Sequence, residues 1–229
     1  MHEATKTRSL WGDRELQILS GKGIDIGCGK DRVSPDVRPF EREHGDANVI
    51  TRHVKEQFDF VFSAHCLEHM HNPKTALLEW WQLVRPGGHL FFIVPDEDLY
   101  EQGMWPPIFN PDHKATFTLS KRSSWSKCSH NVLDLIHSLP HSELVDVRLH
   151  DEHFDRTYLK HRPCPRWWAR VFASIRTNTI LLCRARGVEL ELKWFAPLFR
   201  VPIDQTVGKA SAQIQAIVRK VDTPAPRLD

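Results

Sequence analysis

A short apolar run that ends in two glycines, Gly23-Ile24-Asp25-Ile26-Gly27-Cys28-Gly29, constrains the fold of this chain more than any other stretch. Glycine lets a strand turn sharply and lets a ligand approach bare backbone, and in doubly wound sheets such a turn follows the first strand. The dinucleotide-binding fingerprint requires a third glycine three residues later, where this chain has Arg32. The stretch therefore indicates a nucleotide-like ligand and argues against a nicotinamide or flavin enzyme.

A second signal lies between residues 58 and 95. Phe58–Ser63 is apolar apart from Asp59 and one serine, which is typical of a parallel strand buried on both faces. A helix is predicted after Asn72-Pro73, ending at a Pro-Gly-Gly stop, and His89–Val94 predicts another buried strand. This order of elements predicts a mostly parallel α/β sheet.

The remaining segments complete that sheet. Leu144–Leu149 and Gln213–Lys220 alternate between apolar and polar residues, as half-exposed strands do, and predict an antiparallel pair at its edge. Residues 97–120 contain prolines and no periodicity, which predicts a long connection that acts as a lid. Short helices are expected at Leu10–Ser20 and near His130–Leu139.

Residues 22–96 resemble the class I S-adenosylmethionine (SAM) methyltransferases. The glycine turn is similar to their motif I, and FDFVFSAHCLEHM, the helix after it and LVRPGGHLFFIVP resemble strand 4, its helix and strand 5 of small-molecule, type 11-like members. The DHK and FT letters within residues 112–118 are also similar to methyltransferases of bacterial glycan and O-antigen gene clusters. The resemblance implies a Rossmann-like doubly wound fold, SAM as cofactor and S-adenosylhomocysteine (SAH) as product.

The first crossover of the sheet is unusually short. Asp36-Val37 follows Gly29 after six residues, whereas a parallel crossover needs about a dozen or more, so either the usual helix is missing or the second strand lies later, near Asp46–Ile50. We favour the first alternative, because Asp36-Val37-Arg38-Pro39 resembles a strand end of shortened family members. Asp36 is then expected at the ribose hydroxyls and Asp46 at the adenine edge. The residues expected to bind the cofactor are Asp25, Gly27, Cys28, Gly29, Asp36, Asp46, Ala47, Ser63, Ala64 and His65.

Methyl transfer to a hydroxyl requires that the acceptor lose a proton, which calls for a general base or a metal. His113 is the first choice for the base, because acceptor-binding residues of the resembling family follow the fifth strand. Asp96 and Glu97 are alternatives, either as bases or as carboxylates for Mg²⁺. Mg²⁺ is not part of the predicted site, and no metal ligands are assigned.

Basic charge is concentrated in one segment. The net charge of +2 combines +8 over residues 156–200 with −6 over the remainder. Residues 166–176 predict a basic amphipathic helix that carries tryptophans, and residues 188–194 predict a strand. We expect a methyltransferase domain of residues 1–155 and 201–229, interrupted by a basic aromatic insertion that contacts a second copy, covers the site as a lid, or lies on a membrane surface.

Bulk properties narrow the function further. The chain shows no apolar run of the roughly 20 residues that a membrane span needs, and its five cysteines include no CxxC pair, which predicts a cytoplasmic protein. No N-P-P-[YF] motif follows the strand at residues 58–63, which argues against a nucleic-acid acceptor. The predicted function is SAM-dependent O-methylation of a sugar or glycan-related hydroxyl. The alternatives are methylation of another small molecule, such as a natural product or a quinone-like acceptor, and a SAM-binding module without activity.

Overall fold

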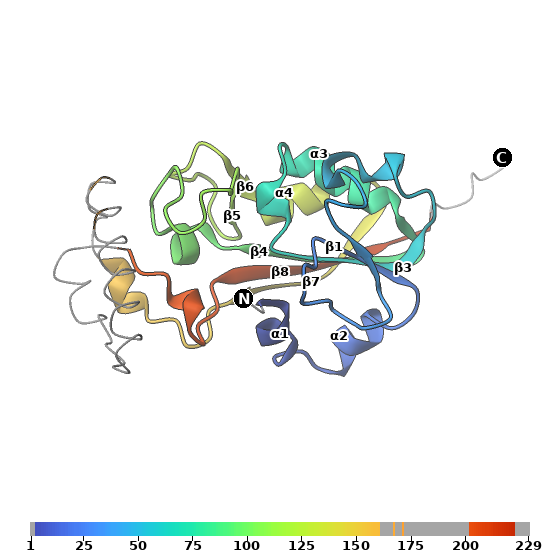
Figure 1. Cartoon of the computed structure of the whole chain (residues 1–229), viewed down its shortest axis with the longest axis horizontal. Helices are drawn as coiled ribbons and strands as arrows, with labels where there is room; N and C mark the ends of the chain where they lie inside the picture. Colours follow the sequence, from blue (N-terminus) through green and yellow to red (C-terminus); the bar gives the residue numbers. More distant parts are fainter. Residues whose placement is uncertain (1–2, 161–166, 168–170, 172–201, 223–229) are drawn as a thin grey trace.

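A six-stranded sheet forms the centre of the computed structural model, which describes residues 3–160, 167, 171 and 202–222 (Figure 1). The strand order is β2-β1-β3-β4-β8-β7; the first four strands run parallel, and β8 is antiparallel to both of its neighbours. The predicted mostly parallel sheet with an antiparallel edge pair is thereby confirmed. Its strands are β1 (Gly23–Ile26), β2 (Arg38–Phe40), β3 (Phe58–Ala64), β4 (Val84–Pro95), β7 (Ser142–His150) and β8 (Gln213–Lys220).

The central strands are buried on both faces, as their apolar sequences predict. Val61 and Phe92 belong to the larger core, whereas Phe60 and Phe91, one residue away in each strand, belong to the smaller core on the opposite face. Trp11 covers the smaller core, with its ring centroid 5.1 Å from that of Phe91. Alternation along β3 and β4 therefore fills two layers at once.

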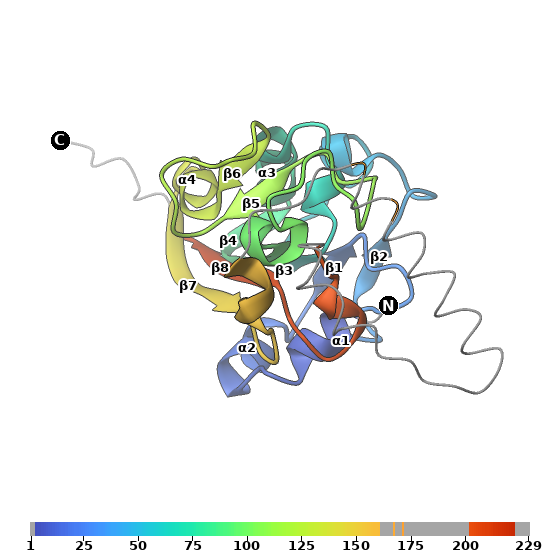
Figure 2. The same ribbon diagram turned by 90° about the vertical axis from the view of Figure 1, so that its left-hand side faces the viewer.

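Helices cover both faces of the sheet, and the two views agree on this (Figures 1 and 2). On one side α3 packs through Trp80 and Trp81, which are almost completely buried and donate their indole N–H groups to the carbonyls of Ala47 and Pro140 at 2.9 Å. Asn72 caps the amino end of α3, because its side chain accepts from the backbone N–H of Thr75, the third residue of the helix. The helices are α1 (Glu3–Arg8) and α2 (Asp13–Ile18) on one side, α3 (Pro73–Gln82) and α4 (Val132–His137) on the other, and the short turns η1 (Ala47–Arg52), η2 (Leu67–His69), η3 (Glu97–Glu101), η4 (Arg156–Lys160) and η6 (Gln205–Val207).

The crossover between β1 and β2 contains no helix in residues 27–37, all of which the structure describes. Val33 and Val37 take the place of a helix by packing into the smaller core. The predicted shortened crossover is thus confirmed. The alternative that placed the second strand at Asp46–Ile50 is wrong, because Ala47–Arg52 forms η1.

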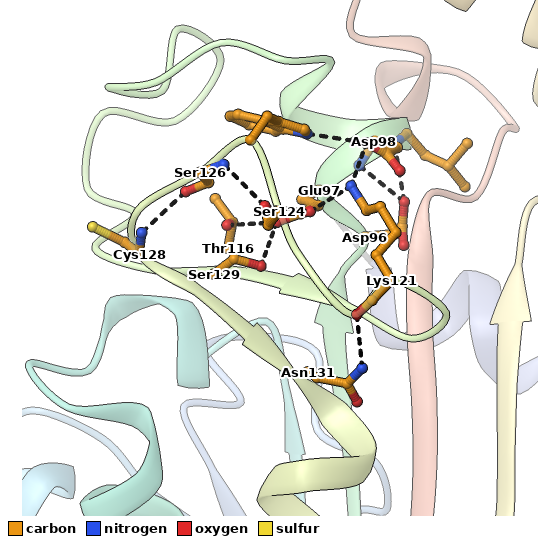
Figure 3. Close-up of polar contacts among 12 residues, drawn as sticks. Asp96, Glu97, Asp98, Thr116, Lys121, Ser124, Ser126, Cys128, Ser129 and Asn131 are labelled. Carbon is orange, nitrogen blue, oxygen red and sulfur yellow. Dashed lines mark hydrogen bonds and ion pairs between the residues drawn. The ribbon is translucent and has the colours of Figure 1, made fainter.

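The segment after β4 is anchored rather than open. It contains the single π-helical turn η3 and a parallel pair of short strands, β5 (Thr116–Thr118) and β6 (Ser129–Asn131). Glu97, fully buried, accepts hydrogen bonds from the hydroxyls of Thr116, Ser124 and Ser129 at 2.6–2.8 Å and pairs with Lys121 at 2.5 Å (Figure 3). One carboxylate therefore ties the expected lid of residues 97–120 to the segment of residues 121–129 that follows it.

The predicted basic insertion lies mostly outside the described residues. Of residues 156–200 the structure describes 156–160, Trp167 and Val171, so the helix expected over 166–176 and the strand expected over 188–194 stay predictions. Within the described part of the chain, no helix has the length and apolar character needed to cross a membrane.

Candidate active site

The glycine turn lies where the carboxyl ends of β1, β2 and β3 meet. Gly27 and Gly29 both adopt positive φ angles, 74° and 55°. A Cβ on Gly27 would lie 2.6 Å from the Sγ atom of Cys66, which follows β3, so the two turns are in contact. A Cβ on Gly29 would meet no heavy atom of the described chain within 4 Å. The turn therefore presents bare backbone to open space at Gly29.

Glu41 supplies the acid at this turn. It follows β2 directly, and its Oε1 accepts from the backbone N–H of Gly29 at 2.6 Å. The expectation that the second strand ends beside Asp36 is wrong, because β2 begins only at Arg38. Asp36 lies exposed at the amino end of β2, whereas ligands of doubly wound sheets bind at the carboxyl ends. The stretch Asp36–Pro39, which resembled a strand end, instead leads into edge strand β2, where Pro39 is tolerated.

Two other residues predicted to bind the cofactor support the turn from beneath. Asp25 is fully buried and accepts from the backbone N–H of Val33 at 2.8 Å, which holds the short crossover against β1. Burial raises the pKa of Asp25 to about 7, although the Val33 hydrogen bond opposes the shift. Ser63 is buried as well, and its hydroxyl donates to the carbonyl of Ile26 at 2.9 Å. Both side chains lack the exposed surface that direct ligand contact requires.

The next predicted pair, Asp46 and Ala47, forms the turn that opens η1. Asp46 is exposed and accepts from the backbone and side-chain amides of Asn48 at 2.9 and 2.8 Å, and the side-chain hydrogen bond is the main reason that its pKa is lowered. Cys28, between the two glycines, has its pKa raised to about 12, first by burial and then by Asp25. This thiol therefore stays protonated at neutral pH and is not a nucleophile.

A cavity of about 150 Å³ opens beyond β3. His65, predicted for the cofactor site, lies at its edge with a positive φ of 54°, and its Nε2 lies 2.7 Å from Oε1 of Gln213. This volume is below the roughly 300–1,000 Å³ of a complete ligand pocket, so the cavity has room for only part of a ligand. The cavity is lined by His65, Glu68, His69, Tyr100, Asn110, His113, Thr206, Ala212 and Gln213.

His113, the predicted base, lies in this cavity and is held by a carboxylate that the sequence analysis did not select. Its Nδ1 lies 2.7 Å from Oε1 of Glu101, and both side chains are almost completely buried. Burial raises the pKa of Glu101, while the hydrogen bond to His113 opposes that shift. When the carboxylate of Glu101 accepts a hydrogen bond from Nδ1–H of His113, the imidazole ring is held in one orientation. In that orientation its Nε2 atom faces Glu68, whose Oε1 is 3.9 Å away.

Glu68 is the least expected member of the site. It has no exposed surface, and among the described residues neither of its oxygens has a hydrogen-bond donor. His65 Nδ1 approaches Oε1 to 3.4 Å. Burial by itself raises the pKa of Glu68, but the imidazoles of His65, His113 and His69 together hold it below its ordinary value. Glu68 was not among the residues that the sequence predicted for the site.

Asp96, the second predicted catalytic residue, serves another purpose in the structure. Its Oδ1 accepts from the backbone N–H groups of Asp98 and Leu99 at 3.0 and 3.1 Å and caps η3 (Figure 3). Burial is the main reason that its pKa is raised to about 6. Neither Asp96 nor Glu97 lines the cavity, so both carboxylates hold the segment that carries Glu101.

Comparison with known proteins agrees with this architecture. Residues 35–92 match a family described as a methyltransferase domain, Methyltransf_11. A solved structure from Bacillus halodurans C-125, assigned as a methyltransferase, is similar over 91% of this chain and 98% of that one, with a TM-score of 0.50 and 12% identity. The fold is that of class I methyltransferases.

Curated proteins that resemble this chain in sequence match it over only part of its length. The ubiquinone biosynthesis O-methyltransferase of Pseudomonas putida (strain F1) is 24% identical in an alignment 120 residues long that covers 40% of this chain and 52% of that protein. The protein of the same name from Aromatoleum aromaticum is 25% identical in an alignment 120 residues long that covers 40% of this chain and 51% of its own length. The chain thus spans about half the length of the curated relatives it matches.

Proposed function

We propose that this chain is a SAM-dependent O-methyltransferase. The observation that carries the proposal is the pairing, at one edge of the sheet, of a glycine turn bonded to Glu41 with a cavity that contains His113 oriented by Glu101. The match of residues 35–92 to a methyltransferase domain supports it.

The residues at the glycine turn fit the cofactor. Backbone at Gly29 faces open space, and the carboxylate of Glu41 beside it can accept from a pair of ribose hydroxyls. Asp46 and Ala47 would hold the adenine edge. When bound, SAM supplies a methyl carbon on a positively charged sulfur, and transfer of that methyl leaves the neutral thioether SAH.

On the acceptor side, the cavity must position a hydroxyl and take its proton. Positioning accounts for much of the rate in an in-line displacement. Glu101 holds the Nδ1–H of His113, so Nε2 is the atom at which the acceptor proton would be accepted. The backbone N–H of Lys114 donates to the carbonyl of Glu68 at 2.7 Å, which fixes the loop of His113 against η2.

The acceptor class that we propose is a sugar or glycan-related hydroxyl. Polar groups of Asn110, Thr206 and Gln213 line the cavity, as binding of a polyhydroxyl ligand requires. A second candidate is a phenolic, quinone-like acceptor, because the curated relatives are named as ubiquinone biosynthesis O-methyltransferases. The basic segment of residues 156–200 is proposed as a contact surface for a second copy or for a membrane, and its binding to an anionic membrane should weaken steeply with salt.

The test begins with titration calorimetry of SAM and SAH. Heat with both ligands is expected, and its absence with both would falsify the proposed function. Methyl release is then measured over sugar and catechol acceptors. Substitution His113→Ala should lower turnover by about 100-fold or more while SAM affinity stays within twofold. The control His137→Ala changes an exposed histidine of α4 and should leave turnover unchanged.

A further inference from the structure

The cavity contains a buried carboxylate whose charge is not satisfied by hydrogen bonds. Glu68 is completely buried, and neither oxygen has a donor among the residues that the structure describes. A carboxylate in such a place is costly unless it pairs with a cation or ligates a metal. The atoms that face it are imidazole nitrogens of His65 and His113, at 3.4 and 3.9 Å.

Glu68, His69 and His113 can each direct one ligand atom at a common point. These atoms lie within 4.8 Å of one another. Metal–ligand bonds of roughly 2.0–2.2 Å place the ligand atoms of one ion within about 4.4 Å of each other, close to the span found. Only small side-chain movements separate this cluster from a coordination shell.

The two histidines are already held as metal-ligating histidines are. His113 has its Nδ1 at 2.7 Å from the carboxylate of Glu101, and His69 has its Nδ1 at 3.2 Å from the carbonyl oxygen of Asp112. Histidine ligands almost always donate their second ring N–H to a carboxylate or a backbone carbonyl, which leaves the other nitrogen for the metal. Both contacts leave Nε2 as the ligand atom.

We propose that Glu68, His69 and His113 form a binding site for one divalent transition-metal ion, of the Zn²⁺, Co²⁺ or Mn²⁺ class. Two imidazoles and one carboxylate suit these ions, whereas Mg²⁺ and Ca²⁺ prefer oxygen ligands throughout. Three protein ligands leave at least one position open. That position faces the cavity lined also by Tyr100 and Asn110, where the acceptor is expected.

This inference rests on the proposed function only for its chemical purpose. An acceptor hydroxyl bound at the open position would lose its proton at lower pH, since a divalent ion stabilises the resulting oxyanion. His113 would then act as a ligand, and Glu101 would position it. The binding site itself stands on the geometry of the cluster.

The test is direct metal binding to the full chain after chelator treatment. Titration with Co²⁺, followed by its visible absorption, and calorimetry with Zn²⁺ should each give one site per chain. Substitutions Glu68→Gln and His69→Ala should weaken binding by at least about 100-fold, and Glu101→Gln by about 10–100-fold, as losses behind the ligands do. Mg²⁺ at the same concentration should not compete.

The matched control variants are His137→Ala and Glu143→Gln, which change an exposed histidine and an exposed carboxylate outside the cavity. Both variants should bind Co²⁺ as the wild type does. Circular dichroism of each variant shows whether it is folded, and His69 is only half-buried, so its substitution is tolerated most easily. Absence of a Co²⁺ site in the wild type, or wild-type Co²⁺ affinity in Glu68→Gln and His69→Ala, would overturn the proposal. SAM calorimetry on the same samples separates the two ideas, since SAM binding without Co²⁺ binding removes only the metal site.

Discussion

Asp25 beneath the glycine turn gives a quantitative test of how burial acts on this site. Its carboxyl group is fully buried, accepts one backbone hydrogen bond from Val33, and has its pKa raised from 3.8 to about 7. A shift of about 3 units corresponds to roughly 4 kcal/mol between the two protonation states. The substitution Asp25→Asn keeps an acceptor for the Val33 N–H but removes the titration.

The sign of the effect follows from the direction of the shift. Below the unfolded pKa of 3.8, Asp25 is protonated in both the folded and the unfolded state and does not lower the free energy of unfolding. As the pH rises towards the folded pKa of about 7, Asp25 ionises first in the unfolded chain, and the wild type loses stability. The Asp25→Asn variant does not lose this stability, because its side chain does not ionise. Its unfolding free energy relative to wild type should therefore increase by roughly 2.5 kcal/mol between about pH 5 and pH 8.5.

Urea unfolding, followed by tryptophan fluorescence at several pH values, measures this difference. Asp59→Asn is the control, because the backbone hydrogen bond from Lys22 and the contact with Arg85 lower the pKa of Asp59, so that it stays ionised across the range. The stability difference for Asp59→Asn should not vary with pH. A pH-independent difference for Asp25→Asn as well would refute the view that burial keeps Asp25 protonated near neutral pH.

Other substitutions test the turn and the segment above it. Glu41→Gln should weaken SAM binding by about 10- to 100-fold, since hydrogen bonds to charged groups contribute roughly 1.5–3 kcal/mol each. Asp36→Asn, at the amino end of β2, should leave the Kd for SAM measured by calorimetry unchanged. Equal losses would place the ribose elsewhere. Gly27→Ala, where the added Cβ meets a thiol at 2.6 Å, should lower unfolding free energy by more than the roughly 1–2 kcal/mol of positive φ alone, whereas Gly29→Ala should cost only that strain. Glu97→Gln removes the charge that holds the lid segment, so amide hydrogen exchange over residues 97–131 should accelerate while the sheet stays protected; an unchanged exchange pattern would count against this function of Glu97.

Local patterns were sufficient for the sheet because its strands are specified by burial. The continuous apolar run at Phe58–Ser63 and the run at Gln213–Lys220 both became strands at or near the expected bounds. The expectation that Gln213–Lys220 is half-exposed is wrong, because β8 lies between β4 and β7 and its first six residues are buried. The crossover of residues 27–37 was also predicted to lack its helix. Such features depend on which residues face a core, and that information lies within each segment.

The acids of the site were harder to predict, since their positions depend on where a strand ends and on contacts between distant segments. The resemblance of Asp36–Pro39 to a strand end placed the acid too early, because edge strand β2 accepts Pro39 and continues to Phe40; the acid at its carboxyl end is Glu41 rather than Asp36. Glu101 and His113 meet only because η3 and the loop after it fold back over the sheet. The one available signal was the LEH sequence at Leu67–His69, in which two polar side chains interrupt an apolar run shortly after a central strand.

The turn after β3 joins the two halves of the site. Cys66 fills the space above Gly27 on the proposed cofactor side, and Glu68, two residues later in η2, supplies the buried carboxylate of the acceptor cavity. The carbonyl of Glu68 also accepts from Lys114, next to His113. Cys66 directly precedes η2, which is a single tight 3₁₀ turn. We therefore expect that a methyl group added at Gly27, which displaces Cys66, also moves Glu68. The Gly27→Ala variant should therefore weaken Co²⁺ binding at Glu68 as well as stability, a combination that Gly29→Ala, with open space around it, should not produce.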